Sequence, residues 1–289
     1  MDVAFRPRIW IDTDIALGAS RGDVDDGFAL AALAAAHRQG RVELLGVSTV
    51  FGNATAAISQ GCARELLRRA GAEVSVVRGA ERAGESTPAA ERIVEATGNN
   101  IEIVALGPLT NLAAACRRDP ELAGRASLRA VGGNLSSRGF LPPLWPFEFN
   151  LARDRKGARF ALSLPWRRVT LFPLDVVRRL TVGAEELDEL GKISDLGNHL
   201  AEQSRRWLRR ARWRHLGRRF PLWDLPAALD ATRLLDSSIE ARPLAPGARW
   251  LLAQPRPLAC LTRFDPSIAW ERFLQLLGNA PASPRIVPG

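Results

Sequence analysis

Residues 12–26 contain five aspartates, and carboxylates gathered in this way can bind a metal ion. They are Asp12, Asp14, Asp23, Asp25 and Asp26. The first two follow the apolar run Ile9–Ile11, which is typical of a buried strand, and the last two begin an apolar helical pattern. Carboxylates this close repel one another unless a cation or protons neutralise them. Hard cations such as Ca²⁺ bind oxygen ligands, largely carboxylates. A helix-capping role would explain only the last two aspartates, so the pattern predicts a divalent-cation site.

Further short motifs follow in a fixed order along the chain. They are Val42–Asn53, an apolar run that ends in Gly-Asn; Val104–Ala113, which reads VALGPLTNLA; Glu148–Asn150, which reads EFN; and Trp223-Asp224. Together with Ile11–Asp14 and the Asp25-Asp26 pair, these motifs resemble the signatures of the nucleoside hydrolases, the inosine- and uridine-preferring ribohydrolase family. The resemblance runs from about residue 8 to residue 277, which is nearly the whole chain.

The resemblance implies an enzyme that hydrolyses the N-glycosidic bond of a ribonucleoside, or of a related riboside, to free base and ribose with the help of Ca²⁺. The implied Ca²⁺ ligands are the side chains of Asp14, Asp26 and Asp224 and the backbone carbonyl of Leu106. Asp14 would also accept the proton of the attacking water. The implied ribose-binding residues are Asp25, Asn53, Glu148 and Asn150. Asp12 would orient the loop behind the ligands. A donor set made only of oxygen independently favours Ca²⁺ or Mg²⁺ over zinc.

Two features depart from the family pattern. Purine-cleaving relatives carry a histidine, the acid for the leaving base, where this chain has Trp223. An indole cannot supply that proton, although it can stack on a nucleobase. In addition, the loop Ile15–Val24 makes the spacing between Asp14 and Asp25 longer than is usual in the family. We therefore expect a substrate preference that differs from that of the inosine-cleaving enzymes.

The remainder of the sequence alternates strand-like and helix-like segments. The strand-like runs are Ile9–Ile11, Val42–Thr49, Val74–Val77, Ile101–Ala105, Leu128–Val131 and Val169–Phe172. This alternation predicts an α/β fold with a mostly parallel central sheet and helices on both faces, which the resemblance describes as nucleoside hydrolase-like with a Rossmann-like core. Ligands of such sheets bind at the carboxyl ends of the strands, where the motif residues fall.

The second half of the chain is predicted to be rich in helices. Helical patterns extend from Ala184 to about Ala231, two short strands are expected near Arg249–Ala253 and Leu258–Leu261, and a last helix is expected over Pro266–Leu277. No linker-like change in composition divides the chain, so we expect residues 1–289 to form a single domain.

The net charge of +9 comes from one segment, residues 203–219, which holds eight arginines and no acid. Removing these eight from the 40 lysines and arginines leaves 32 basic residues against 31 acidic ones. Such a segment is typical of a solvated helix, and a phosphorylated substrate or an acidic partner is the alternative. The N-terminus lacks a signal-peptide pattern, and three cysteines without metal-type spacing fit a reducing compartment. We therefore expect a cytoplasmic protein without membrane spans. The sequence leaves the oligomeric state open, with a dimer or a tetramer as the candidates.

Three other classes of function compete with the leading hypothesis. A catalytically impaired relative that only binds nucleosides or ribosides would fit the missing acid at position 223. A phosphotransferase with a nucleophilic aspartate would need a lysine at a strand end, whereas Lys156 and Lys192 lie in helical patterns. A nucleic-acid-binding protein would depend on the arginine segment alone, so we regard this class as disfavoured.

Overall fold

The computed structural model describes residues 6–19, 22–98, 100–136, 149–211, 218–245 and 256–279. Within these ranges, eight strands form one sheet in the order β3-β2-β1-β4-β5-β6-β10-β9. Their bounds are β1 Arg8–Thr13, β2 Glu43–Thr49, β3 Val76–Arg78, β4 Ile101–Ala105, β5 Ala126–Val131, β6 Arg168–Phe172, β9 Ser237–Arg242 and β10 Leu258–Phe264. All neighbours pair in parallel except β9 and β10, which confirms the prediction of a mostly parallel sheet.

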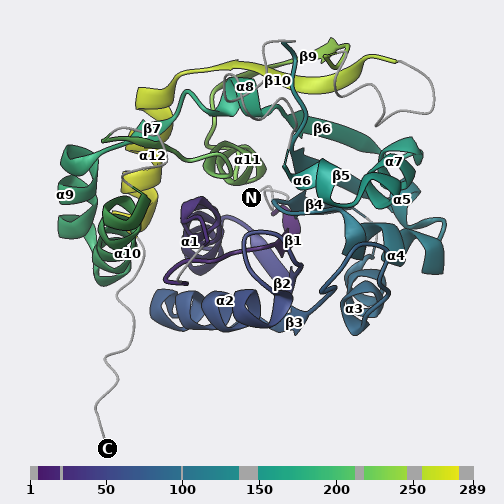
Figure 1. The fold of residues 1–289 in the computed structure, drawn as a ribbon, viewed down its shortest axis with the longest axis horizontal. Helices are drawn as coiled ribbons and strands as arrows, with labels where there is room; N and C mark the ends of the chain where they lie inside the picture. Colours follow the sequence, from purple (N-terminus) through teal and green to yellow (C-terminus); the bar gives the residue numbers. More distant parts are fainter. Residues whose placement is uncertain are drawn as a thin grey trace, which may run out of the picture.

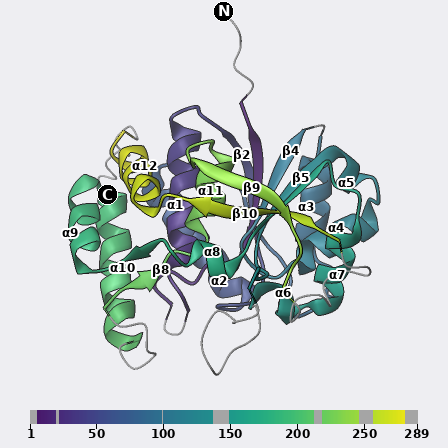
Figure 2. The same cartoon turned by 90° about the horizontal axis from the view of Figure 1, so that it is seen from above.

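Helices cover both faces of this sheet (Figures 1 and 2). One apolar core lies under α1 (Asp25–Arg38), α2 (Ala56–Ala70), α11 (Leu225–Ala231) and α12 (Pro266–Gly278), with α9 (Ala184–Ile193) and α10 (Asp195–Ala211) farther out. The other core lies under α3 (Pro88–Ala96), α4 (Thr110–Arg118), α5 (Leu122–Arg125) and α7 (Arg155–Ser163). Among these helices, none is both long and apolar enough to cross a membrane.

Short elements complete the fold near the carboxyl ends of the strands. They are α6 (Asn150–Arg153), α8 (Leu174–Val177) and a small antiparallel pair, β7 (Thr181–Val182) with β8 (Phe220–Pro221). The predicted strand near Leu258–Leu261 is β10, whereas the one predicted near Arg249–Ala253 lies outside the described residues. The edge strand β9 was not predicted, because its sequence SSIEAR has no apolar run.

Helix α1 explains how two aspartates reach the centre of the molecule. Every residue of the helix from Asp25 to Ala36 is buried, because α2, α11 and α12 surround it beside the sheet. An apolar surface on all sides is typical of such an enclosed helix, and the many alanines let its neighbours approach closely. The acidic first turn and the basic last turn, which ends in His37 and Arg38, both match the helix dipole.

Strand β1 lies at the point where the order of the sheet reverses. Its neighbours are β2 on one side and β4 on the other, and both run parallel to it. The crevice outside the carboxyl ends at such a reversal is the usual ligand site of a doubly wound sheet. At that edge the backbone N–H of Leu106, which follows β4, donates to the carbonyl of Asp12, with 2.8 Å between N and O. The residues after β1, β2 and β4 are therefore placed around one crevice.

Candidate active site

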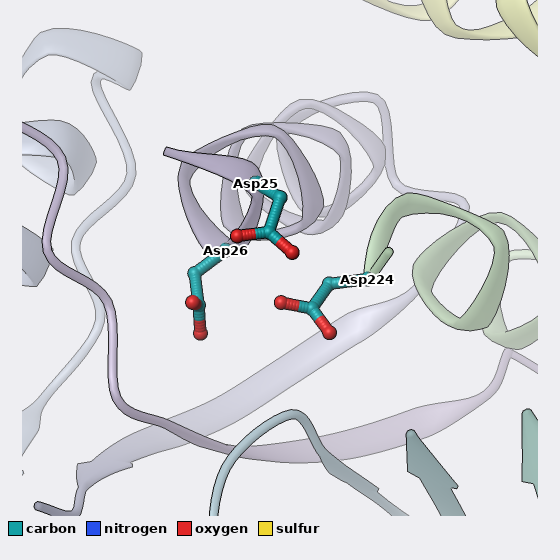
Figure 3. Close-up of side chains that lie close together, drawn as sticks. All are labelled: Asp25, Asp26 and Asp224. Carbon is teal, nitrogen blue, oxygen red and sulfur yellow. The ribbon is translucent and has the colours of Figure 1, made fainter. Parts of the chain in front are cut away.

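Three carboxylates meet at the carboxyl edge of the sheet (Figure 3). Asp25 and Asp26 come from the first turn of α1, and Asp224 comes from the residue before α11. Each offers an oxygen atom, and these atoms all lie within 4.8 Å of one another. All three residues are at most 3% exposed, so water screens the repulsion between their charges only weakly. Three buried carboxylates around one space need a cation or protons to be stable.

Asp14 lies beside this trio at the end of β1 and is fully buried. Its Oδ2 accepts a hydrogen bond from the backbone N–H of Asn53, with 2.6 Å between the atoms. Its Oδ1 has no hydrogen-bond partner among the described residues. Two glycine backbones hold the carboxylate closely, since a Cβ on Gly52 would lie 1.8 Å from Oδ2 and one on Gly107 would lie 3.1 Å from Oδ1. The motifs contain these glycines, but sequence reasoning missed their steric role.

Asp26 is held by the strand end and by the loop after β2. The hydroxyl of Thr13 donates to one of its oxygens, and the Asn53 amide donates to the other across 3.2 Å. Thr13 also accepts a bond from the backbone N–H of Ile15, so it fixes the chain where it leaves β1. Sequence reasoning assigned no role to Thr13, although its place between two motif aspartates was a usable signal. Asn53 thus contacts both Asp14 and Asp26.

Burial dominates the electrostatics of this site. It raises the pKa of Asp14, Asp25 and Asp224 well above the ordinary value, and neighbouring carboxylates raise these pKa values further. Burial also raises the pKa of Asp26 to about 6, while the Thr13 hydroxyl opposes that shift. Oδ1 of Asp14 and Oδ1 of Asp25 have no hydrogen-bond partner among the described residues. Unpaired carboxylate oxygens in an all-oxygen set fit a hard divalent cation such as Ca²⁺ or Mg²⁺.

Asp12 belongs to a separate buried network beneath the site. Its Oδ1 accepts from the Ser48 hydroxyl at 2.5 Å and from the Asn111 amide at 2.8 Å. Burial raises the pKa of Asp12 to about 7 despite these two bonds. Asn111 also donates to the carbonyl of Thr49 and accepts from the backbone N–H of Ala80. The network therefore ties β1, β2 and α4 together directly behind Asp14.

Leu106, Asn150 and Trp223, three of the remaining predicted residues, lie around the same edge. The Asn150 amide nitrogen donates to the carbonyl of Leu106 at 2.5 Å and to that of Val131 at 3.2 Å. The Leu106 carbonyl keeps its second lone pair for another partner. Trp223 is partly buried and packs against the core under α1. Glu148 lies outside the described residues.

A doubly wound sheet with buried carboxylates at its switch point is the architecture of a ligand-binding α/β enzyme. Comparison with known families makes this specific, because residues 9–243 match the model of the family described as inosine-uridine preferring nucleoside hydrolase. The chain therefore belongs to the nucleoside hydrolases, which are enzymes of ribonucleoside hydrolysis.

Individual relatives are distant in sequence. An uncharacterised protein of Schizosaccharomyces pombe is 28% identical over 238 residues, which cover 70% of this chain and 71% of that protein. A plant nucleoside hydrolase superposes with a TM-score of 0.77 at 19% identity and covers 94% of this chain and 99% of its own. A purine-preferring ribonucleoside hydrolase from Gardnerella vaginalis superposes with a TM-score of 0.72 at 20% identity, with coverages of 94% and 98%. At these identities the structural likenesses support the fold alone.

Proposed function

We propose that this nucleoside hydrolase cleaves the N-glycosidic bond of a ribonucleoside, or of a related riboside, with Ca²⁺ as its cofactor. The observation that carries the proposal is the group of four buried carboxylates, Asp14, Asp25, Asp26 and Asp224, at the switch point of the sheet. Burial of so much like charge is unfavourable unless a cation balances it. The products are the free base and ribose.

In this proposal Asp26, Asp224 and the Leu106 carbonyl hold the cation together with Asp14. A bound divalent cation supplies Lewis acidity and orients hydroxyl groups. Asp14 accepts the proton of the attacking water as the general base. Its seat between Gly52 and Gly107 keeps the carboxylate in one place, as general-base catalysis requires.

The ribose is held by polar groups around the carboxylates. Asp25 accepts from a ribose hydroxyl through its unpartnered Oδ1, and Asn53 and Glu148 contribute further bonds. The Asn150 amide nitrogen is already used by two backbone carbonyls, so its Oδ1 is the atom that faces a hydroxyl. Asp12 does not touch the sugar and instead keeps the end of β1 in place.

Trp223 takes the place of a leaving-group acid and stacks on the base. The two described histidines do not supply that acid. Nδ1 of His37 accepts a hydrogen bond from the backbone N–H of Leu44, and burial on α10 lowers the pKa of His199. His215 lies outside the described residues. The proposal therefore favours leaving groups that depart without prior protonation.

The test is release of ribose from a panel of purine and pyrimidine nucleosides, with EDTA and with added Ca²⁺. We expect ribose only with the cation, and a loss of kcat by orders of magnitude in Asp14→Asn. Asp188→Asn, which removes a carboxylate from exposed α9, serves as the matched control. Release of ribose in EDTA at the full rate, or wild-type kcat in Asp14→Asn, would contradict the proposal.

The family match and the fold do not favour the alternative of a catalytically impaired relative that only binds nucleosides or ribosides. We further propose that the enzyme acts in nucleoside catabolism or salvage in the cytoplasm. Its partner is a small-molecule nucleoside or riboside, and an assembly of two or four copies stays a prediction that analytical ultracentrifugation would test.

A further inference from the structure

Arg153, the last residue of α6, carries an exposed positive charge beside the candidate site. Its guanidinium lies over the ring of Phe149, 4.2 Å from the ring centroid. No carboxylate among the described residues forms an ion pair with it. The aromatic contact orients the guanidinium while leaving its N–H donors available for an anion.

The position of α6 directs this charge toward the site. The helix begins at Asn150, whose amide is bonded to the carbonyls of Leu106 and Val131 at the ends of β4 and β5. Arg153 is three residues farther along and therefore shares the face of Asn150. In agreement, Arg153 lies close enough to Asp14 for their charges to interact.

The junction between α6 and α7 is fixed. Asp154 follows Arg153 directly, and its carboxylate accepts from the Thr110 hydroxyl at 2.7 Å and from the backbone N–H groups of Gly157 at 2.8 Å and Gly84 at 3.2 Å. The buried carboxylate caps α7 and ties the junction to α4 and to the loop after β3. Arg153 is thus attached to a rigid position at the edge of the crevice.

A neutral nucleoside does not require a cation at this place. The site holds several carboxylates, so it would repel an anionic substrate unless a positive charge stood close to the bound molecule. A guanidinium binds phosphate and carboxylate oxygens through paired N–H donors.

We propose that Arg153 binds an anionic group of the substrate, so that the enzyme prefers a charged riboside to a neutral one. The charge is a phosphate on the ribose, as in a ribonucleoside 5′-monophosphate, or a carboxylate on the base. This inference rests on the proposed function of the same site. For the phosphate case, water oxygen bonds to C1′, the base leaves with the electron pair of the C1′–N bond, one water proton passes to Asp14, and ribose 5-phosphate is released.

The experiment compares kcat/KM for three matched substrates in the presence of Ca²⁺. Uridine is neutral, uridine 5′-monophosphate adds a phosphate on the sugar, and orotidine adds a carboxylate on the base. The ratio of each anionic substrate to uridine is measured for the wild type, for Arg153→Gln, and for Arg159→Gln as a control. Arg159 is an exposed arginine of α7, so the control removes the same charge from the neighbouring helix.

We expect one of the two ratios to be about 10 or more in the wild type, which corresponds to one charge-assisted hydrogen bond. Arg153→Gln should bring that ratio close to about 1, and Arg159→Gln should preserve it. The ratio that exceeds unity identifies phosphate or carboxylate as the bound group. Good cleavage of uridine with both ratios at or below unity, or a ratio unchanged in Arg153→Gln, overturns the inference and leaves the proposed function intact. Absence of cleavage of every riboside overturns the proposed function itself.

Discussion

Gly52→Ala is the sharpest test of how Asp14 is held in the site. An added Cβ at position 52 would lie 1.8 Å from Oδ2 of Asp14 and 2.6 Å from its Cγ. Real Cβ atoms stay at least 3.0 Å from such neighbours, so the carboxylate must move by about 1.2 Å, the difference between these two distances. That movement also breaks the 2.6 Å bond from the backbone N–H of Asn53. A misplacement of about 1 Å can lower a rate about 100-fold, or roughly 2.7 kcal/mol in barrier height.

The assay measures kcat for ribose release at saturating Ca²⁺, with thermal unfolding as a check of folding. Gly61→Ala is the matched control, because no atom lies within 4 Å of the Cβ that this change adds to α2. We expect Gly61→Ala to keep wild-type kcat and to gain about 1 kcal/mol of stability from helix propensity. Wild-type kcat in a folded Gly52→Ala protein would refute the assignment of Asp14 as the base.

Three further predictions concern stability, pH and substrate. Arg129→Met should lower the free energy of unfolding by about 3–5 kcal/mol and weaken Ca²⁺ binding. The Arg129 side chain is only 11% exposed and pairs with Glu102 of β4 and with Asp230, at the far end of the helix that follows Asp224. Denaturant titration and calorimetry test this, and an unchanged Ca²⁺ affinity would contradict it. In EDTA the folded protein binds more protons than the unfolded chain, because burial raises the pKa of Asp26 from 3.8 to about 6. The free energy of unfolding should therefore fall as the pH rises through this range, by on the order of 3 kcal/mol from Asp26 alone, whereas the stabilisation by Ca²⁺ should grow. Thermal unfolding should show that stability falls with pH in EDTA and that the added stability from Ca²⁺ rises with pH. p-Nitrophenyl riboside, whose leaving group needs no proton, should be cleaved much faster than inosine. Trp223→His should raise the rate of inosine cleavage more than the rate of nitrophenyl riboside cleavage. Equal rates on the two substrates in the wild type would show that an acid is present.

The sequence predicted the buried part of the sheet well, because burial leaves a direct mark on composition. Strand β4 has the predicted bounds, Ile101–Ala105, since three of its five residues are β-branched and apolar. The edge strand β9 escaped prediction because its exposed residues need not be apolar. The short helix α6 was also missed, since four residues carry too little periodicity to stand out.

For the candidate site, the sequence indicated residue types and their order but not their contacts. Asp26 and Asp224 were predicted as Ca²⁺ ligands and Asp25 as a ribose-binding residue. Their carboxylates meet although Asp224 is far away in the chain. The steric role of Gly52 could not be seen, because a glycine in a motif has many possible reasons. A role for the charge of Arg153 likewise could not be predicted from the sequence, because it depends on the place of α6 near Asp14.

The loop between Asp14 and Asp25 is longer than is usual in the family, yet Asp25 and Asp26 still lie at the end of β1. Its first residues, Ile15 to Leu17, are buried in the core under α1, so the chain turns inward as soon as it leaves β1. The loop then returns over itself at Gly22, where a Cβ would lie 1.8 Å from the Cβ of Ala16. This contact admits only a glycine, so Gly22 packs directly against Ala16 near the start of the loop. Asp25 and Asp26 thereby return to the end of β1, where the charge of Asp26 raises the pKa of Asp14.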